Sequence, residues 1–148
     1  YNEFVTDFET VLQFVKKEQP QQKIGVWAFS MGTLVATLAY KETPFDVMIG
    51  EAFVVDPPTT VKRIQDQKNK TLILPKGAKK VKKTLHRINI PMLVVCGTKD
   101  EVTTLEDGKM ITQHYKNRRL FTFEGGHLQG ARVLGFERYL QEIKEILI

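Results

Sequence analysis

The segment KIGVWAFSMG at positions 23–32 decides the fold of this chain. Its first part, residues 23–29, is a short apolar run that follows a turn-like Gln-Pro-Gln-Gln segment. Small and apolar residues with helical spacing occupy positions 33–41. The pattern predicts a strand buried on both faces, as in parallel sheets, then a sharp junction at residues 30–32 and then a helix.

The alternation of strand and helix continues on both sides of this segment. Apolar runs and amphipathic stretches predict strands at 45–49, 90–96 and 120–123, and helices from 4 to near 20, at 105–115 and at 131–147. Residues 53–55 either extend the second strand or open the loop after it. This order is typical of βαβ units, so we expect an α/β fold, an open parallel sheet flanked by helices.

The length of 148 residues fits about one domain. A chain with 42% hydrophobic residues is not mainly disordered. No apolar stretch approaches the ~18–20 residues of a membrane span and no segment resembles a signal peptide, so we expect a cytoplasmic protein. The single cysteine, Cys96, excludes an internal disulfide and a cysteine-based zinc cluster, and it is expected to be a core side chain.

The positive charge of the chain is concentrated between residues 57 and 90. This segment holds ten Lys and Arg side chains and one acidic residue, Asp66, whereas the net charge of the whole chain is +5. It contains no aromatic residue on which bases can stack, and we predict no binding of nucleic acid. Its lysines form either a solvated face or a surface that attracts an anionic substrate or carrier, such as an acidic lipid head group or an acyl-carrier protein.

Reactive side chains follow three of the four predicted strands. Ser30 follows the first, Asp100 the third and His127 the fourth. The carboxyl ends of parallel strands meet at one edge of a sheet, where ligands bind. A histidine there can take the proton of a serine hydroxyl, and a carboxylate can orient the histidine. If Asp100 is not the carboxylate that orients the histidine, Glu101 is the first alternative and Asp107, farther along the chain, is the second.

These residues stand in motifs that resemble those of the α/β-hydrolase family. Ala-Phe-Ser-Met-Gly at 28–32 is similar to the family's Gly-x-Ser-x-Gly nucleophile elbow, with alanine in place of the first glycine. Gly-Thr-Lys-Asp at 97–100 stands where the family carries its acid. Gly-Gly-His at 125–127 follows the last strand, where the family carries its histidine.

The resemblance implies a serine hydrolase that cleaves a small carboxylic ester or thioester through an acyl-enzyme on Ser30. It also implies that His127 is the base, that Asp100 orients it, and that the Met31 amide stabilises the oxyanion. No metal or organic cofactor is implied. Acyl transfer and peptide cleavage stay open, because the same three side chains serve them all.

The basic segment at 57–90 stands where the family carries a lid over its acyl pocket. We expect a short cap-like insertion with small helices around 61–67 and 79–85. Leu72 and Leu74 belong to an apolar patch within it and are predicted to line the substrate entrance.

The resemblance covers only the C-terminal half of the family's fold. Strands that precede the nucleophile strand, and the loop with the second oxyanion donor, have no counterpart here. We therefore expect residues 1–148 to form a partial α/β-hydrolase domain of a longer chain. The strand at 24–29 would then have a bare edge, through which the isolated piece is expected to associate with itself while showing little hydrolase activity.

Two other functions remain open from the sequence. One is a catalytically silent α/β-hydrolase relative that binds a ligand or a partner. The other is a Rossmann-like nucleotide binder, which the lack of Gly-x-Gly-x-x-Gly after the first strand disfavours.

Overall fold

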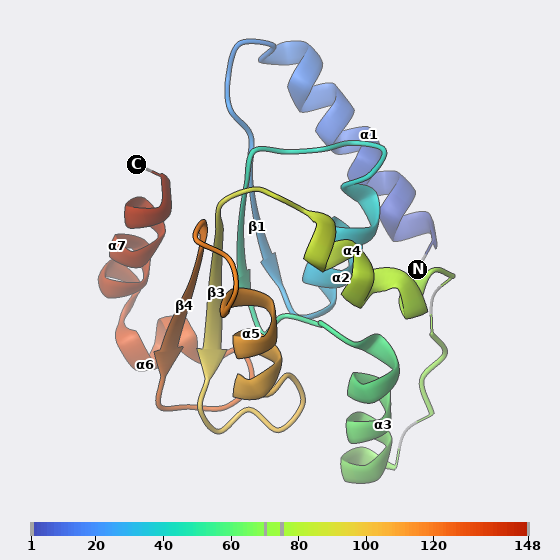
Figure 1. Ribbon diagram of the computed structural model, residues 1–148, viewed down its shortest axis with the longest axis vertical. Coiled ribbons are helices and arrows are strands. Elements are labelled where there is room, and N and C mark those ends of the chain that lie inside the picture. Colours follow the sequence, from blue (N-terminus) through green and yellow to red (C-terminus); the bar gives the residue numbers. More distant parts are fainter. Residues whose placement is uncertain (1, 70, 75, 148) are drawn as a thin grey trace.

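The structure is a computed structural model that describes residues 2–69, 71–74 and 76–147 (Figure 1). Its elements in chain order are α1 (Asn2–Glu18), β1 (Gly25–Phe29), α2 (Met31–Ala39), β2 (Val47–Glu51), α3 (Pro57–Lys68), the 3-10 helix η1 (Ala78–Lys80), α4 (Val81–Arg87), β3 (Met92–Gly97), α5 (Leu105–Thr112), β4 (Arg118–Phe123), α6 (Gly130–Leu134) and α7 (Phe136–Leu147).

The four strands form one parallel sheet in the order β1-β2-β3-β4. The expected α/β architecture is confirmed. Because all strands run the same way, their carboxyl ends lie along one edge. The register pairs Phe29 with Glu51 and Gly97 with Phe123, so these strands end nearly level with one another. The loops after β1, β3 and β4, which hold the predicted site residues, therefore start from neighbouring points.

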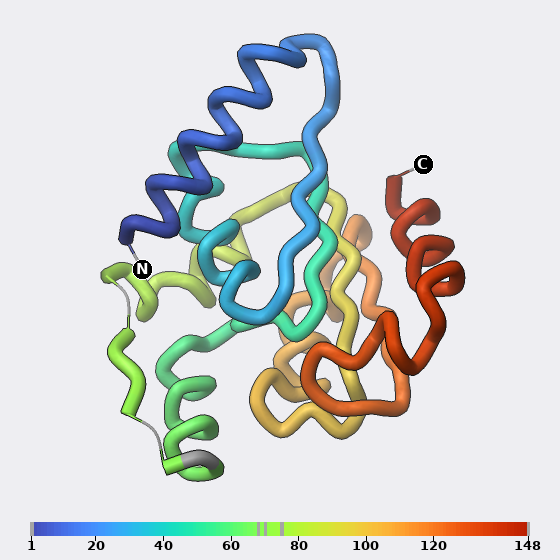
Figure 2. The backbone as a smooth tube through the Cα atoms, turned by 180° about the vertical axis from the view of Figure 1, so that it is seen from behind, coloured from blue at the N-terminus to red at the C-terminus, as the bar shows by residue number. Residues whose placement is uncertain are grey.

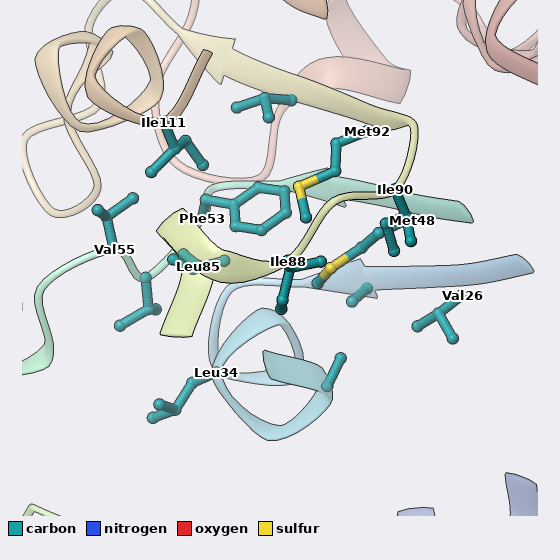
Figure 3. Packing of buried hydrophobic residues seen from close by; sticks show 14 of the residues in the cluster. Val26, Leu34, Met48, Phe53, Val55, Leu85, Ile88, Ile90, Met92 and Ile111 are labelled. Atoms are coloured by element: carbon teal, nitrogen blue, oxygen red, sulfur yellow. The ribbon is translucent and has the colours of Figure 1, made fainter. Parts of the chain in front are cut away.

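Helices cover both faces of the sheet. On one face, side chains of α1, α2, α4 and α5 join the strands in the larger apolar cluster, part of which Figure 3 shows. On the other face, Tyr139 and Ile143 of α7 pack on Val47, Ile49, Leu93 and Val95. Figure 2 shows α1 and α7 on opposite flanks of the molecule. The strands in the middle, β2 and β3, are buried throughout, as parallel strands between two layers of helices must be.

The prediction that β1 is buried on both faces is wrong. Val26 and Ala28 point into the larger cluster, but Trp27 is 41% exposed and Phe29 is 44% exposed. In the register these two residues lie beside Ile49 and Glu51 of β2, on the face that α7 covers. Since β1 is at the edge of the sheet, α7 reaches only as far as Trp27, which stacks against Tyr139.

The predicted closing helix at 131–147 is divided into α6 and α7. The break is at Gly135, whose φ of 80° lies in the region that favours glycine. Residues 53–55 do not extend β2. They open the following loop, and the Phe53 ring lies in the core (Figure 3). The ring is so close to Gly50 that a Cβ at position 50 would overlap it.

The segment at 57–90 contains the two expected helical regions, but they differ in role. Helix α3 lies near the carboxyl ends of the strands, where Ser30 is also found. Helix α4 is part of the layer over the sheet, because Val81 and Leu85 are completely buried in the larger cluster. None of the described helices has the length and apolar character needed to cross a membrane.

Candidate active site

The turn at Ser30 places its hydroxyl at the sheet edge. Ser30 has φ 46° and ψ −115°, a combination that costs about 1–3 kcal/mol for a residue with a side chain. Hydrogen bonds hold the turn from both sides. The Ser30 amide donates to the Glu51 carbonyl at 2.9 Å, and the Ser30 carbonyl accepts from the Thr33 amide and hydroxyl at 2.9 and 2.7 Å. A tight strand-to-helix turn of this kind leaves the serine exposed to a substrate.

The loop before His127 is held against the end of β3. The Thr98 amide donates to the Phe123 carbonyl and the Lys99 amide to the Gly125 carbonyl. Gly97 makes this approach possible, because a Cβ at this position would overlap the carbonyl oxygens of Gly125 and Gly126. The loops that carry Asp100 and His127 are thus joined backbone to backbone.

Ser30, His127 and Asp100 form one continuous chain of hydrogen bonds. The Ser30 Oγ and the His127 Nε2 are 2.9 Å apart, and the His127 Nδ1 and the Asp100 Oδ2 are also 2.9 Å apart. A carboxylate only accepts, so Nδ1 carries the proton and Nε2 is free to accept the hydroxyl proton of Ser30. This arrangement can activate a serine as a nucleophile.

Asp100 is buried, with 6% of its surface exposed, and its carboxylate accepts hydrogen bonds from the two residues Val102 and Thr103 and from His127. Oδ1 accepts from the amides of Val102 and Thr103, and Oδ2 accepts from the Thr103 hydroxyl and from His127. Burial raises the pKa of the Asp100 carboxyl, but the hydrogen bonds from His127, Thr103 and Val102 outweigh it and hold the pKa below its usual value. The group is therefore ionised at neutral pH.

The substitute acids lie elsewhere. The Glu101 side chain is exposed, and the Glu101 backbone carbonyl accepts from Gln67 of α3. Asp107 forms a partly buried ion pair with Arg63 of α3 and caps the start of α5 through the Thr104 amide. Neither carboxylate contacts His127. The Arg63 and Gln67 contacts also fasten α3 to the loop that carries Asp100.

A small, mainly apolar pocket of about 80 Å³ opens beside Ser30. It is lined from the elbow, α2, α3 and the loops, and its walls include Met31, Leu34, Val54, Ile64, Leu72 and Leu74. The predicted entrance residues Leu72 and Leu74 thus line the same pocket as Ser30. The Met31 amide begins α2, where backbone amides lack an acceptor within the helix. No described residue accepts a hydrogen bond from it.

The remaining reactive groups do not join the site. Burial raises the pKa of the Cys96 thiol to about 12, so it stays protonated in the core. Within the described residues, no group of three or more His, Cys, Asp or Glu side chains is placed to hold a metal ion.

Sequence reasoning missed two contacts around the acid. From the sequence, Thr103 is a candidate for the residue that caps a helix. In the structure its hydroxyl donates to Asp100 and lies 3.3 Å from His127 Nδ1. A threonine three residues after the acid was the available signal. The Arg63–Asp107 pair spans 44 positions, and the sequence carries no local signal for it.

The fold is that of the α/β-hydrolase class. The esterase Pf2001 of Pyrococcus furiosus has a similar structure, with a TM-score of 0.76 at 20% identity. An esterase domain from Rhodothermus marinus is also similar, with a TM-score of 0.72 at 12% identity. Residues 1–129 match the family described as Serine hydrolase (FSH1), and the chain belongs to this family.

A curated relative matches a shorter segment. The 3-oxoadipate enol-lactonase 2 of Acinetobacter baylyi is 40% identical over 51 residues, which are 34% of this chain and 19% of the lactonase. The similarity to Pf2001 covers 97% of this chain but 60% of the esterase, and that to the Rhodothermus domain covers 96% and 67%. The chain thus corresponds to part of these proteins.

Proposed function

We propose that the protein hydrolyses carboxylic esters or thioesters, with Ser30 as the nucleophile. The observation that carries the proposal is the hydrogen-bond chain from Ser30 Oγ through His127 to Asp100, at 2.9 Å in both steps. It lies beside an apolar pocket and at the edge where parallel sheets bind ligands. Membership of a serine hydrolase family supports it.

The geometry supports a two-step mechanism. The Ser30 oxygen attacks the acyl carbon while His127 Nε2 takes its proton, and the Met31 amide donates to the oxygen that becomes negative. The bond to the alcohol or thiol then breaks, and His127 returns the proton to this leaving group. Water next attacks the acyl-enzyme, with His127 again as the base, and releases the acid and free Ser30. Asp100 stabilises the imidazolium in both steps.

The pocket favours an uncharged, apolar acyl group. Leu34, Ile64 and Val102 contribute apolar walls, and none of the described residues that line the pocket is a Lys or an Arg. Arg63 directly precedes the lining residue Ile64 in the sequence, but its guanidinium is already bound to Asp107. A charged acyl group would lose its hydration there without a partner. The names of the relatives agree with ester chemistry, since a lactone is a cyclic ester.

The test uses the intact protein, a fluorophosphonate label and a short nitrophenyl ester. We expect the label to attach to Ser30, and we expect Ser30→Ala and His127→Ala each to lower kcat by roughly 10⁴-fold or more. Both side chains lie at the edge of the sheet and outside the core, so circular dichroism should be unchanged.

The competing function is a catalytically silent relative that binds a ligand or a partner. An intact protein that neither takes the label nor turns over esters would support that function and overturn the proposal. Near-normal turnover by Ser30→Ala would overturn the assignment of the nucleophile.

A further inference from the structure

The last residue of β2, Glu51, is a carboxylate buried where an apolar residue is expected. Val47 and Ile49 alternate with it along the strand and pack under α7. Glu51 itself is only 2% exposed, and it forms no ion pair with any described residue. Buried charges need several hydrogen bonds to remain ionised.

Both carboxylate oxygens of Glu51 are occupied by donors from distant parts of the chain. Oε1 accepts from the Gly130 amide at 2.8 Å, and Oε2 accepts from the Tyr139 hydroxyl at 2.9 Å. Burial and the neighbouring carboxylate raise the pKa of the Tyr139 phenol, so it keeps its proton and donates. The His127 ring contacts Ser30, Asp100 and Thr103, and Glu51 is not among its hydrogen-bond partners in the described residues.

These contacts join the two loops that carry Ser30 and His127. Gly130 is the first residue of α6 and comes three positions after His127, so its amide fixes the downstream end of the histidine loop. The backbone carbonyl of the same Glu51 accepts from the Ser30 amide at 2.9 Å. One residue thus holds the serine turn through its backbone and the histidine loop through its side chain.

We propose that Glu51 is a positioning residue, which keeps His127 Nε2 within hydrogen-bond distance of Ser30 Oγ. This inference rests on the proposed function. The upstream end of the histidine loop is already held by Thr98 and Lys99. Without Glu51, the hydrogen bond that remains in the described part of this loop is the one from the Gly126 amide to Gln129, which lies within the loop itself, and the downstream end would otherwise be held by the packing of α6.

The first test compares kinetics of Glu51 variants in the intact protein with a short nitrophenyl ester. We expect Glu51→Ala to lower kcat by about 10²-fold with little change in KM, because a displacement of about 1 Å at a catalytic group has an effect of this size. We expect Glu51→Gln to keep most of the activity. Its amide oxygen still accepts from Gly130 and its NH₂ group donates to the Tyr139 oxygen.

The matched control is Glu142→Ala. Glu142 is also a buried acid, but it pairs with Arg119 and Arg138 of β4 and α7, away from the histidine loop. It is expected to lower stability and to leave kcat unchanged. If Glu51→Ala does not fold, Tyr139→Phe replaces it, because this variant removes one of the two side-chain bonds and should give an intermediate loss of kcat.

A second measurement does not need activity. The low-field proton resonance of the His127 Nδ1–H···Asp100 bond, assigned by its loss in His127→Ala, should weaken or shift in Glu51→Ala and stay in Glu142→Ala. Wild-type protein without esterase activity would refute the proposed function, yet this resonance would still test Glu51. Unchanged kcat in a folded Glu51→Ala, an unshifted resonance, or a Glu51→Gln variant as slow as Glu51→Ala would each overturn the positioning role.

Discussion

Four hydrogen bonds fix the carboxylate of Asp100, and they separate it from the acids nearby. Val102 and Thr103 supply three of these hydrogen bonds and hold both oxygens without the help of His127. The carboxylate is therefore already ordered when the imidazolium forms. Glu101, the next residue, has an exposed side chain with no such donors around it. Adjacent carboxyl groups in the sequence therefore have different environments, and one of them alone faces His127.

Replacing each acid by its amide tests this difference. We expect Asp100→Asn to lower kcat by roughly 10⁴-fold, because an amide cannot stabilise the imidazolium and favours the wrong tautomer of His127. Glu101→Gln should remain close to wild type. Steady-state hydrolysis of a short nitrophenyl ester measures both, and the opposite ranking would transfer the role to Glu101.

The hydroxyl of Thr103 should affect stability in a way that depends on pH. It donates to Asp100 Oδ2 at 2.7 Å and contributes to the lowered pKa of that carboxyl. Because the pKa in the folded state is lowered, the stabilisation is present above the pKa of the unfolded state. It is lost as the pH falls through the pKa of the folded state.

We expect Thr103→Val to lower the free energy of unfolding by about 1–3 kcal/mol at neutral pH. The difference from wild type should shrink below pH ~3.9, the pKa of an unfolded aspartate. Thr103→Ser retains the hydroxyl and serves as the control. Urea unfolding across this range measures the effect, and a difference independent of pH would assign it to packing.

At the scale of elements, the loop that follows β4 lies so close to the end of β3 that there is no space for a side chain at the point of contact. Two backbone hydrogen bonds join the loops, from Thr98 to Phe123 and from Lys99 to Gly125. Gly97 stands at the point of contact. The position of His127 relative to Asp100 thus depends on a contact between backbones.

Substitution of alanine for two nearby glycines tests this contact. A Cβ on Gly97 would overlap the carbonyl oxygens of Gly125 and Gly126, whereas a Cβ on Gly126 would have its nearest neighbour at 3.6 Å. We expect Gly97→Ala to lower both kcat and the melting temperature and Gly126→Ala to change them little. Equal effects of the two substitutions would show that the approach of the loops does not control the site.

At the scale of the whole molecule, the described sheet ends in two edge strands, β1 and β4, and of these two β1 carries exposed large apolar side chains. Trp27 and Phe29 of β1 are exposed on the face of the sheet that α7 covers in part. An edge strand of this kind offers unpaired backbone groups beside apolar surface, and both favour association with another strand.

We therefore expect residues 1–148, expressed alone, to self-associate through the edge at 24–29. Phe29→Lys should reduce the association, because a charged lysine on an edge strand opposes pairing. Phe14→Lys is the control, since Phe14 is another exposed aromatic residue and lies on α1. Sedimentation velocity measures the outcome, and a monodisperse wild-type monomer would contradict the expectation.

Most of the fold was predictable from the sequence, because its signals are local. The apolar runs that become β2 and β3 are buried on both sides because these are the two inner strands of the sheet, so composition alone reveals them. The same reasoning failed for β1, whose apolar run is equally clear. Exposure of Trp27 and Phe29 depends on how far α7 reaches across the sheet, and no local pattern encodes that.

For the site, the sequence by itself determined which side chains follow the strands and in which order. Ser30, Asp100 and His127 could be chosen because a parallel topology brings the carboxyl ends of all strands to one edge. The tertiary structure alone decided their distances, the donors around Asp100 and the burial of Glu51. Such contacts join residues far apart in the chain, as the bond between Glu51 and Gly130 does across 79 positions. They form only when separate elements pack together, so no spacing in the sequence records them.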